Sequence, residues 1–227
     1  GLGDVYKRQI LYRGRLDILS GNWKGFHRIY IFRNNKFVDL RDPSFNRPSK
    51  VRTIISADFD NDGYDEVFVN NIGEPNRLFK IKENGLLEKI TLDNAKLEKG
   101  LGTGAAVADI DGDGVLELLI SNGESLRQPL NLFKANINRN FNYLRIRPIN
   151  IYNAPARGAT VILKTNLRRH AKTIDAGSGY LCQMEPVAHF GIREDEKDFE
   201  IIIKWTNGDT QTLKINDLNQ EIKVKQS

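Results

Sequence analysis

Short apolar runs that end in turn-forming residues recur along the chain and predict β-strands. Residues 67–69 and 118–120 are continuous apolar runs, and each is followed by an asparagine-containing pair that is typical of turns. The segments before them, residues 53–57 and 104–108, are too short and too rich in β-branched residues or glycine for helices. The pattern therefore predicts an all-β protein whose strands are joined by short loops.

This strand pattern repeats along the first part of the chain. Gly14, Gly63 and Gly114 hold equivalent places in it, and a second strand of shared pattern follows each of them. Those second strands are residues 28–32, 77–81 and 131–134, and residues 85–90 add a third strand to one repeat. A spacing of about fifty residues, with several short strands per repeat, is typical of propeller blades. We expect a partial β-propeller of about two and a half blades, with its functional loops between strands.

The C-terminal part of the chain predicts a second, smaller β domain. Ile201, Ile203 and Trp205 fall on alternate positions, so one face of that strand belongs to a core. Asn207-Gly208 lies between two candidate strands and is a strong hairpin signal. The candidate strands are residues 143–149, 159–165, 171–176, 199–205, 210–215 and 221–224. A compact antiparallel sandwich or barrel is the expected architecture.

Two acidic loops of identical spacing lie between predicted strands of the repeats. Each has carboxylates at its positions 1, 3, 5 and 9 and a glycine at position 6. The carboxylates are Asp58, Asp60, Asp62 and Glu66 in the first loop and Asp109, Asp111, Asp113 and Glu117 in the second. Ca²⁺ takes about six to eight oxygen ligands, and the glycine permits a sharp turn that presents the position-7 carbonyl, that of Tyr64 or Val115. The loops therefore predict two calcium sites of structural character.

Two other kinds of loop have a similar composition. An EF-hand needs a glutamate at position 12 and flanking helices, but Val69 and Ile120 stand there. A solvated turn explains one acidic loop, because Asp, Asn and Gly dominate turns, but repetition favours the metal site. A degenerate third copy lies upstream, where Gln9, Leu11 and Arg13 replace the first three ligands and exclude a cation.

The repeats and loops resemble the FG-GAP/VCBS repeats of integrin-α-like β-propellers. The C-terminal part is similar to the ASPIC/UnbV domain of the cartilage acidic protein family, on residues 142–146, 158–161, 176–181, 189–191 and 204–208. The resemblance implies Ca²⁺ on one propeller face and a binding or adhesion role outside the cell. It divides the chain into propeller repeats (10–139) and an ASPIC/UnbV-like domain (140–227), and we expect residues 1–9 to be a non-native leader. We expect the chain as a whole to be an N-terminally truncated fragment.

Composition and charge limit the classes of binding partner and the cellular location that we expect for the chain. The net charge of the chain is +5. Along residues 28–33 basic residues alternate with apolar ones, as on the solvent face of a strand. No nucleic-acid-binding signature appears, and no apolar run approaches the ~18 residues of a membrane span. Cys182 is the only cysteine, so no internal disulfide forms. Calcium loops and the resemblance favour an extracellular, periplasmic or cell-surface location, with a protein or glycan as the ligand.

No catalytic motif emerges from the sequence. Residues 100–105 imitate a dinucleotide-binding fingerprint but lead into the second acidic loop instead of a helix. Cys182 could pair with His170 or His189, although a structural role is the stronger expectation for a lone cysteine. We therefore expect a non-enzymatic module. Two alternatives stay open: an accessory scaffold of a larger secreted hydrolase that acts on lipids or glycans, and a glycan-binding module that uses Ca²⁺ directly.

Overall fold

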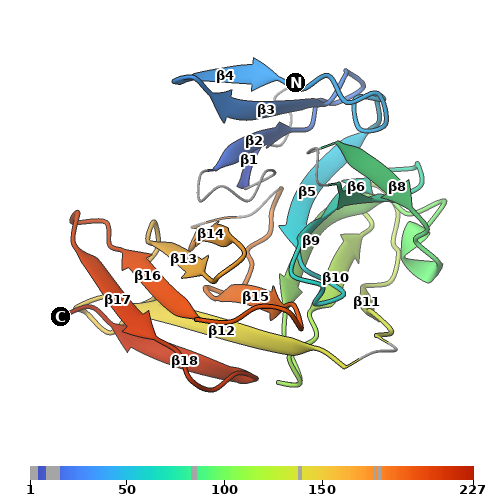
Figure 1. The fold of residues 1–227 in the computed structure, drawn as a ribbon. Coiled ribbons are helices and arrows are strands. Elements are labelled where there is room, and N and C mark those ends of the chain that lie inside the picture. Colours follow the sequence, from blue (N-terminus) through green and yellow to red (C-terminus); the bar gives the residue numbers. More distant parts are fainter. Residues whose placement is uncertain (1–4, 9–15, 83–85, 138–139, 176, 178–179) are drawn as a thin grey trace.

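The computed structural model describes residues 5–8, 16–82, 86–137, 140–175, 177 and 180–227. In this part of the chain the regular structure is β-strand throughout, apart from one 3₁₀ turn, η1 (Asn94–Lys96). The strands form five sheets, three from β1 to β11 and two from β12 to β18 (Figure 1). The all-β prediction is confirmed. No helix within the described residues has the length and apolar character needed to cross a membrane.

Three consecutive sheets make up the repeat region, and neighbouring strands in each are antiparallel. The first sheet contains β1 (Val5–Arg8), β2 (Asp17–Ser20), β3 (Arg28–Arg33) and β4 (Lys36–Asp39). The second contains β5 (Val51–Ala57), β6 (Glu66–Asn71), β7 (Arg77–Ile81) and β8 (Leu87–Ile90). The third contains β9 (Gly102–Ala108), β10 (Glu117–Asn122) and β11 (Asn131–Lys134). Their first strands contact one another, β1 with β5 and β5 with β9, as in a partial propeller.

Residues 1–9 match no repeat by sequence, yet part of this segment belongs to the first sheet. Residues 5–8 form β1, which pairs with β2 from Val5 opposite Ser20 to Arg8 opposite Asp17. This is the position that β5 and β9 take in the next two sheets. The degenerate loop positions Gln9, Leu11 and Arg13 lie outside the described residues.

The sheets of the repeat region pack on one another through apolar side chains. β6 is buried at every position, because it lies between neighbouring sheets on both faces, and this explains its continuous apolar run. Phe45, from the linker between β4 and β5, is fully buried between the first and second sheets. Its ring meets that of Phe79 edge-on, with centroids 5.6 Å apart. The linker that follows the first sheet therefore completes the packing of the second.

The C-terminal domain is a two-sheet sandwich. One sheet contains β15 (Ala188–Ile192), β12 (Asn142–Ile149) and β18 (Gln220–Lys225). The other contains β14 (Arg169–Thr173), β13 (Thr160–Lys164), β16 (Glu200–Lys204) and β17 (Thr210–Lys214). Alternate side chains of the two sheets, including Leu144, Val161, Phe190 and Ile203, form its core. The sandwich prediction is confirmed, except that β12 and β18 pair in parallel.

The C-terminal domain packs against the second and third sheets. In Figure 1 the orange segment between β14 and β15 runs alongside β5. From this segment the Tyr180 N–H donates to Thr53 Oγ1 at 3.3 Å, and the Cys182 thiol donates to the Ala105 carbonyl at 2.8 Å. Met184 is buried within the core of the repeat region. The two parts of the chain therefore share a buried interface at the inner strands β5 and β9.

Candidate metal centre

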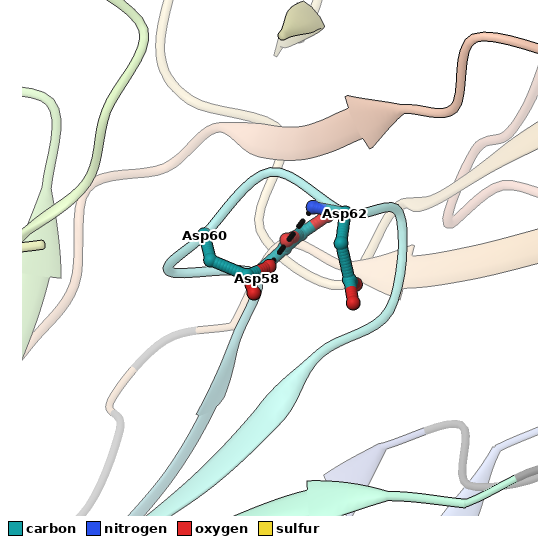
Figure 2. A group of neighbouring side chains, drawn as sticks. All are labelled: Asp58, Asp60 and Asp62. Carbon is teal, nitrogen blue, oxygen red and sulfur yellow. Dashed lines mark hydrogen bonds between the residues drawn. The ribbon is translucent and has the colours of Figure 1, made fainter. Parts of the chain in front are cut away.

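Both acidic loops connect the first two strands of a sheet in the same register. Ala57 pairs with Glu66 across the first loop, and Ala108 pairs with Glu117 across the second. Figure 2 shows Asp58, Asp60 and Asp62 together on the first loop. One carboxylate oxygen from each of these three lies within 4.8 Å of the other two, and Asp109, Asp111 and Glu117 form the corresponding group in the second loop.

One set of hydrogen bonds shapes both loops. In the first loop, Asp60 accepts from the Asp62 N–H at 3.0 Å, the dashed line in Figure 2, and Asp62 accepts from the Tyr64 N–H at 2.9 Å. The Asp58 carboxylate accepts from the Gly63 N–H at 3.0 Å, and Glu66 accepts from the Phe59 N–H at 3.0 Å.

The second loop repeats each of these bonds. Its four acceptors are Asp111, Asp113, Asp109 and Glu117, and the donating backbone N–H groups belong to Asp113, Val115, Gly114 and Ile110. Gly63 at φ 92° and Gly114 at φ 84° adopt left-handed backbone that a side chain would strain. The predicted glycine turn is therefore present in both loops.

Two carboxylates of the first loop are buried, and each has one oxygen without a hydrogen-bond partner among the described residues. Asp58 is 0% exposed and Glu66 is 2% exposed. Asp58 Oδ1 and Glu66 Oε1 are the two buried oxygens without such a partner. Burial raises the pKa of Asp58 to about 8; Lys172 opposes this rise, and the carboxylates of Asp65, Asp62 and Asp60 add to it. Buried, mutually repelling carboxylates of this kind fit an oxygen-binding cation.

Burial is also the main cause that raises the pKa of Glu66 well above its ordinary value, and Asp58 is the next cause. Two neighbouring acids with raised pKa values indicate that the first loop carries more carboxylate groups than its own donors can stabilise. A divalent cation would supply a partner for the unbonded oxygens and would lower both pKa values.

The second loop has the same ligand groups but a more exposed setting. Asp111 and Asp113 have side chains 60% and 51% exposed. The Lys134 ammonium lies 2.7 Å from Asp111, 2.8 Å from Asp113 and 2.7 Å from Glu117. Burial alone would lower the pKa of Lys134, but its bonds to these carboxylates together raise the pKa above the usual value.

Lys80 holds the equivalent position beside the first loop. It pairs across the sheet with Glu66, as Lys134 pairs with Glu117, and it forms an ion pair with Asp62. Its distance to Asp60 is 3.7 Å. A lysine on the third strand of the second sheet and one on the third strand of the third sheet therefore balance part of the charge of the acidic loops.

The C-terminal domain bonds directly to the first loop. The Gly191 N–H donates to Asp58 Oδ2 at 3.1 Å. Asn61, at loop position 4, is fully buried and left-handed at φ 54°. Its amide nitrogen donates to the Gly114 carbonyl at 2.8 Å, and its amide oxygen lies 2.7 Å from His189 Nε2. Asn61 therefore joins the two loops and the C-terminal domain at one point.

Asp65 lies outside the carboxylate group of the first loop, and Leu116 stands at the same position of the second loop. The Asp65 carboxylate accepts from the Lys172 ammonium at 2.7 Å and from the Ser56 hydroxyl at 3.1 Å. His170 Nε2 lies 3.6 Å from the same carboxylate. Asp65 and Lys172 are both buried, so this ion pair fixes the orientation of the C-terminal domain on the second sheet.

The second loop also meets the C-terminal domain. Arg145 is 4% exposed, and it lies 3.4 Å from Asp109, 2.7 Å from Glu185 and 3.3 Å from Glu221. The Tyr143 ring lies so close to Gly114 that a Cβ there would be 2.0 Å from a ring carbon. The C-terminal domain therefore contacts both acidic loops.

Cys182, His170 and His189 make structural contacts at the interface between the repeats and the C-terminal domain. Cys182 donates to Ala105, and His189 stacks on Tyr143 with centroids 6.0 Å apart. Burial is the main cause that lowers the pKa of His189 well below its ordinary value, and nearby Lys172 and Arg145 add to it. His170 meets Phe190 edge-on at 5.3 Å. Each of the three side chains that the sequence offered for a Cys–His pair is therefore engaged in packing or bonding at the interface.

Two families match most of the chain between them. The FG-GAP-like repeat matches residues 13–69 and 58–120, and ASPIC and UnbV matches residues 150–227. Cartilage acidic protein 1 of Homo sapiens is 46% identical over 86% of this chain and 31% of its own length. The Mus musculus protein of that name is 46% identical and the Xenopus tropicalis protein 44% identical, each over 86% of this chain and 32% of its own length. The chain thus spans about a third of the length of the curated relatives it matches.

Proposed function

This chain belongs to the proteins that combine FG-GAP-like repeats with an ASPIC/UnbV domain, and we propose that it is a calcium-stabilised binding module outside the cell. Similarity to cartilage acidic protein 1 supports an extracellular, non-enzymatic role. The ligand residues in this proposal are Asp58, Asp60, Asp62 and Glu66 with the Tyr64 carbonyl, and Asp109, Asp111, Asp113 and Glu117 with the Val115 carbonyl.

The observation that carries the proposal is the buried charge of the first loop. Two buried oxygens there, Asp58 Oδ1 and Glu66 Oε1, have no hydrogen-bond partner among the described residues. A buried acceptor without a partner costs on the order of 1–3 kcal/mol, and more when it is charged. Ca²⁺ would remove this cost, because carboxylate oxygens are the ligands that it prefers.

Calcium would act structurally in this role. The first loop bonds to the C-terminal domain through Asp58 and Asn61, and it bonds to the second loop through Asn61. A cation that fixes Asp58 would also fix the surface on which Gly191 and His189 dock. We therefore propose that Ca²⁺ stabilises the interface between the repeats and the C-terminal domain. A protein or glycan partner would then bind the chain in this arrangement.

The test is a pair of thermal melts, one in excess EDTA and one in a few millimolar Ca²⁺. Extracellular-type sites have Kd values of about 10⁻⁴–10⁻³ M. At tenfold excess each site adds about 1.4 kcal/mol, which raises Tm by several degrees for a chain of this size. Mg²⁺ at the same concentration should give a smaller shift, because it demands tighter octahedral geometry.

A double variant tests the ligands themselves. Asp60→Ala with Asp111→Ala should abolish the calcium-dependent rise in Tm and the binding heat. The matched control removes two exposed carboxylates outside the loops, Glu194→Ala with Asp217→Ala, and should leave both intact. Unchanged calcium stoichiometry in the loop variant would refute the ligand assignment. Sugar binding that disappears with chelator would instead favour the direct glycan-binding alternative.

A further inference from the structure

A buried hydrogen bond joins the two acidic loops directly. Asn61, at position 4 of the first loop, donates from its amide nitrogen to the carbonyl of Gly114, at position 6 of the second, at 2.8 Å. Both residues are buried, and Asn61 is 0% exposed. Breaking this bond would leave a buried amide and a buried carbonyl with no water to replace the lost partner. The bond therefore ties the arrangement of one loop to that of the other.

On the second loop, this bond reaches a peptide group that also contacts a proposed ligand. The peptide between Gly114 and Val115 is planar and trans, so its carbonyl and its N–H point in opposite directions. The carbonyl accepts from Asn61, and the Val115 N–H donates to the Asp113 carboxylate at 2.9 Å. The Gly114 N–H donates to the Asp109 carboxylate at 3.1 Å. A cation that fixes Asp109 and Asp113 would therefore also fix the carbonyl that Asn61 contacts.

On the first loop, Asn61 stands between two proposed ligands. It follows Asp60 and precedes Asp62, and the Asp60 carboxylate accepts from the Asp62 N–H at 3.0 Å. The Asn61 backbone is left-handed at φ 54°, so its conformation is part of the turn that brings Asp60 and Asp62 together. Holding the Asn61 amide from the second loop would therefore also hold this turn.

A second connection between the loops runs through the C-terminal domain. Asn61 Oδ1 lies 2.7 Å from His189 Nε2, and His189 stacks on Tyr143 with ring centroids 6.0 Å apart. The Tyr143 ring lies against Gly114, where a Cβ would be 2.0 Å from a ring carbon. Asn61 and Gly114 are thus connected both directly and through the His189–Tyr143 pair, and a displacement of either loop would disturb the other.

We propose that the two calcium sites are coupled and that Asn61 is the positioning residue that links them. The inference rests on the proposed function, because it requires both loops to bind Ca²⁺. The first cation to bind fixes the contact between Asn61 and Gly114, so the second cation meets a loop that is already ordered. Each site then raises the affinity of the other by the same factor, and such factors are typically about 5–150-fold.

Calorimetric titration of three chains tests the coupling. The intact chain gives the product of its two calcium association constants. Asp111→Ala leaves the first site alone and Asp60→Ala leaves the second alone, so these two chains give the uncoupled constants. The product for the intact chain should exceed the product of the two single-site constants about fivefold or more. Ile110→Ala is the matched control, because Ile110 is an exposed neighbour of Asp111 in the same loop, and it should leave the product for the intact chain unchanged.

Asn61→Gly tests the residue that links the sites. Glycine tolerates left-handed backbone, and it is the residue at the same position of the second loop, Gly112 at φ 79°. In the Asn61→Gly background, the product for the two-site chain should equal the product of its single-site constants. An excess that persists in this background would overturn the assignment to Asn61.

The titrations also separate this inference from the proposed function. If the intact chain bound no Ca²⁺, both would fail. If both sites bound Ca²⁺ and the intact chain showed no excess, or showed a deficit, the coupling alone would be overturned. The first three chains keep Asn61 in place, so they decide the coupling even where Asn61→Gly destabilises the fold.

Discussion

Gly191→Ala tests most directly whether the C-terminal domain shapes the first acidic loop. A Cβ at this position would lie 2.3 Å from Asp58 Oδ2 and 2.7 Å from backbone atoms of Asn61. The Asn61 backbone is buried and already left-handed, so it has little room to move. The substitution therefore has to separate the two domains locally or displace the loop.

The cost follows from two effects. Overpacking of a tight contact costs about 1–3 kcal/mol. Weakening the hydrogen bond from the Gly191 N–H to a buried carboxylate costs about 1.5–3 kcal/mol more. We expect a total loss of about 2.5–6 kcal/mol in the free energy of unfolding. At roughly 2–4 °C per kcal/mol for a chain of this length, Tm should fall by about 5 °C or more.

The assay combines denaturant unfolding with a calcium titration by calorimetry. Calcium affinity at the first loop should fall, and the second loop should keep its binding heat. Gly177→Ala is the matched control in the same domain, because a Cβ there meets nothing within 4 Å. If Gly191→Ala matched Gly177→Ala in both stability and calcium affinity, the contact between domain and loop would not be the constraint that the geometry implies.

Three further outcomes follow from the same contacts. Asp58 has a raised pKa of about 8, so without Ca²⁺ its contribution to stability should fall as pH rises from about 4 to 8, because the folded chain retains a proton that the unfolded chain releases. Denaturant melts at pH 5 and pH 8 should show this slope in EDTA and lose it in Ca²⁺. Lys172→Met should cost about 3–5 kcal/mol by removing the cation that pairs with the buried Asp65 carboxylate, and adding Asp65→Asn should recover most of the loss in the same melts. Phe45→Ala should cost about 3–5 kcal/mol in chemical denaturation, whereas exposed Phe37→Ala should cost about 0.5 kcal/mol.

The carboxylates of the loops were predictable because their pattern is local. Position 1 to position 9 of each loop lies within nine consecutive residues, so sequence spacing alone places Asp58 near Asp60 and Asp62. The strands on either side were equally clear, since apolar runs of this length between turns have few other outcomes. The repetition of the loop then favours a metal site over a solvated turn, a distinction that one loop alone does not make.

The contacts that hold the first loop could not be read from the sequence. Gly191 lies 133 positions from Asp58, and His189 lies 128 positions from Asn61. Nothing local marks such a glycine or histidine as a partner of an acidic loop. The difference in burial between the two loops was hidden for the same reason, because it depends on which surface the C-terminal domain covers.

The strands missed or displaced in the C-terminal domain have a related explanation. β14 begins at Arg169, two residues before the expected strand 171–176. His170 and Lys172 are buried in fact, where they serve the ion pair with Asp65. β15 is buried at all five positions and therefore shows no polar alternation.

The asparagine at position 4 of the first loop has a consequence for how such repeats can be rearranged. Asn61 binds both Gly114 and His189, whereas the same position of the second loop is Gly112, which has no atom within 4 Å of where a Cβ would stand. Exchanging the two loops would preserve the carboxylates at positions 1, 3, 5 and 9 and the turn glycine of each loop, yet it would leave His189 facing a residue without an amide. The two copies have thus ceased to be interchangeable parts, and duplication or shuffling of these blades is constrained by their order.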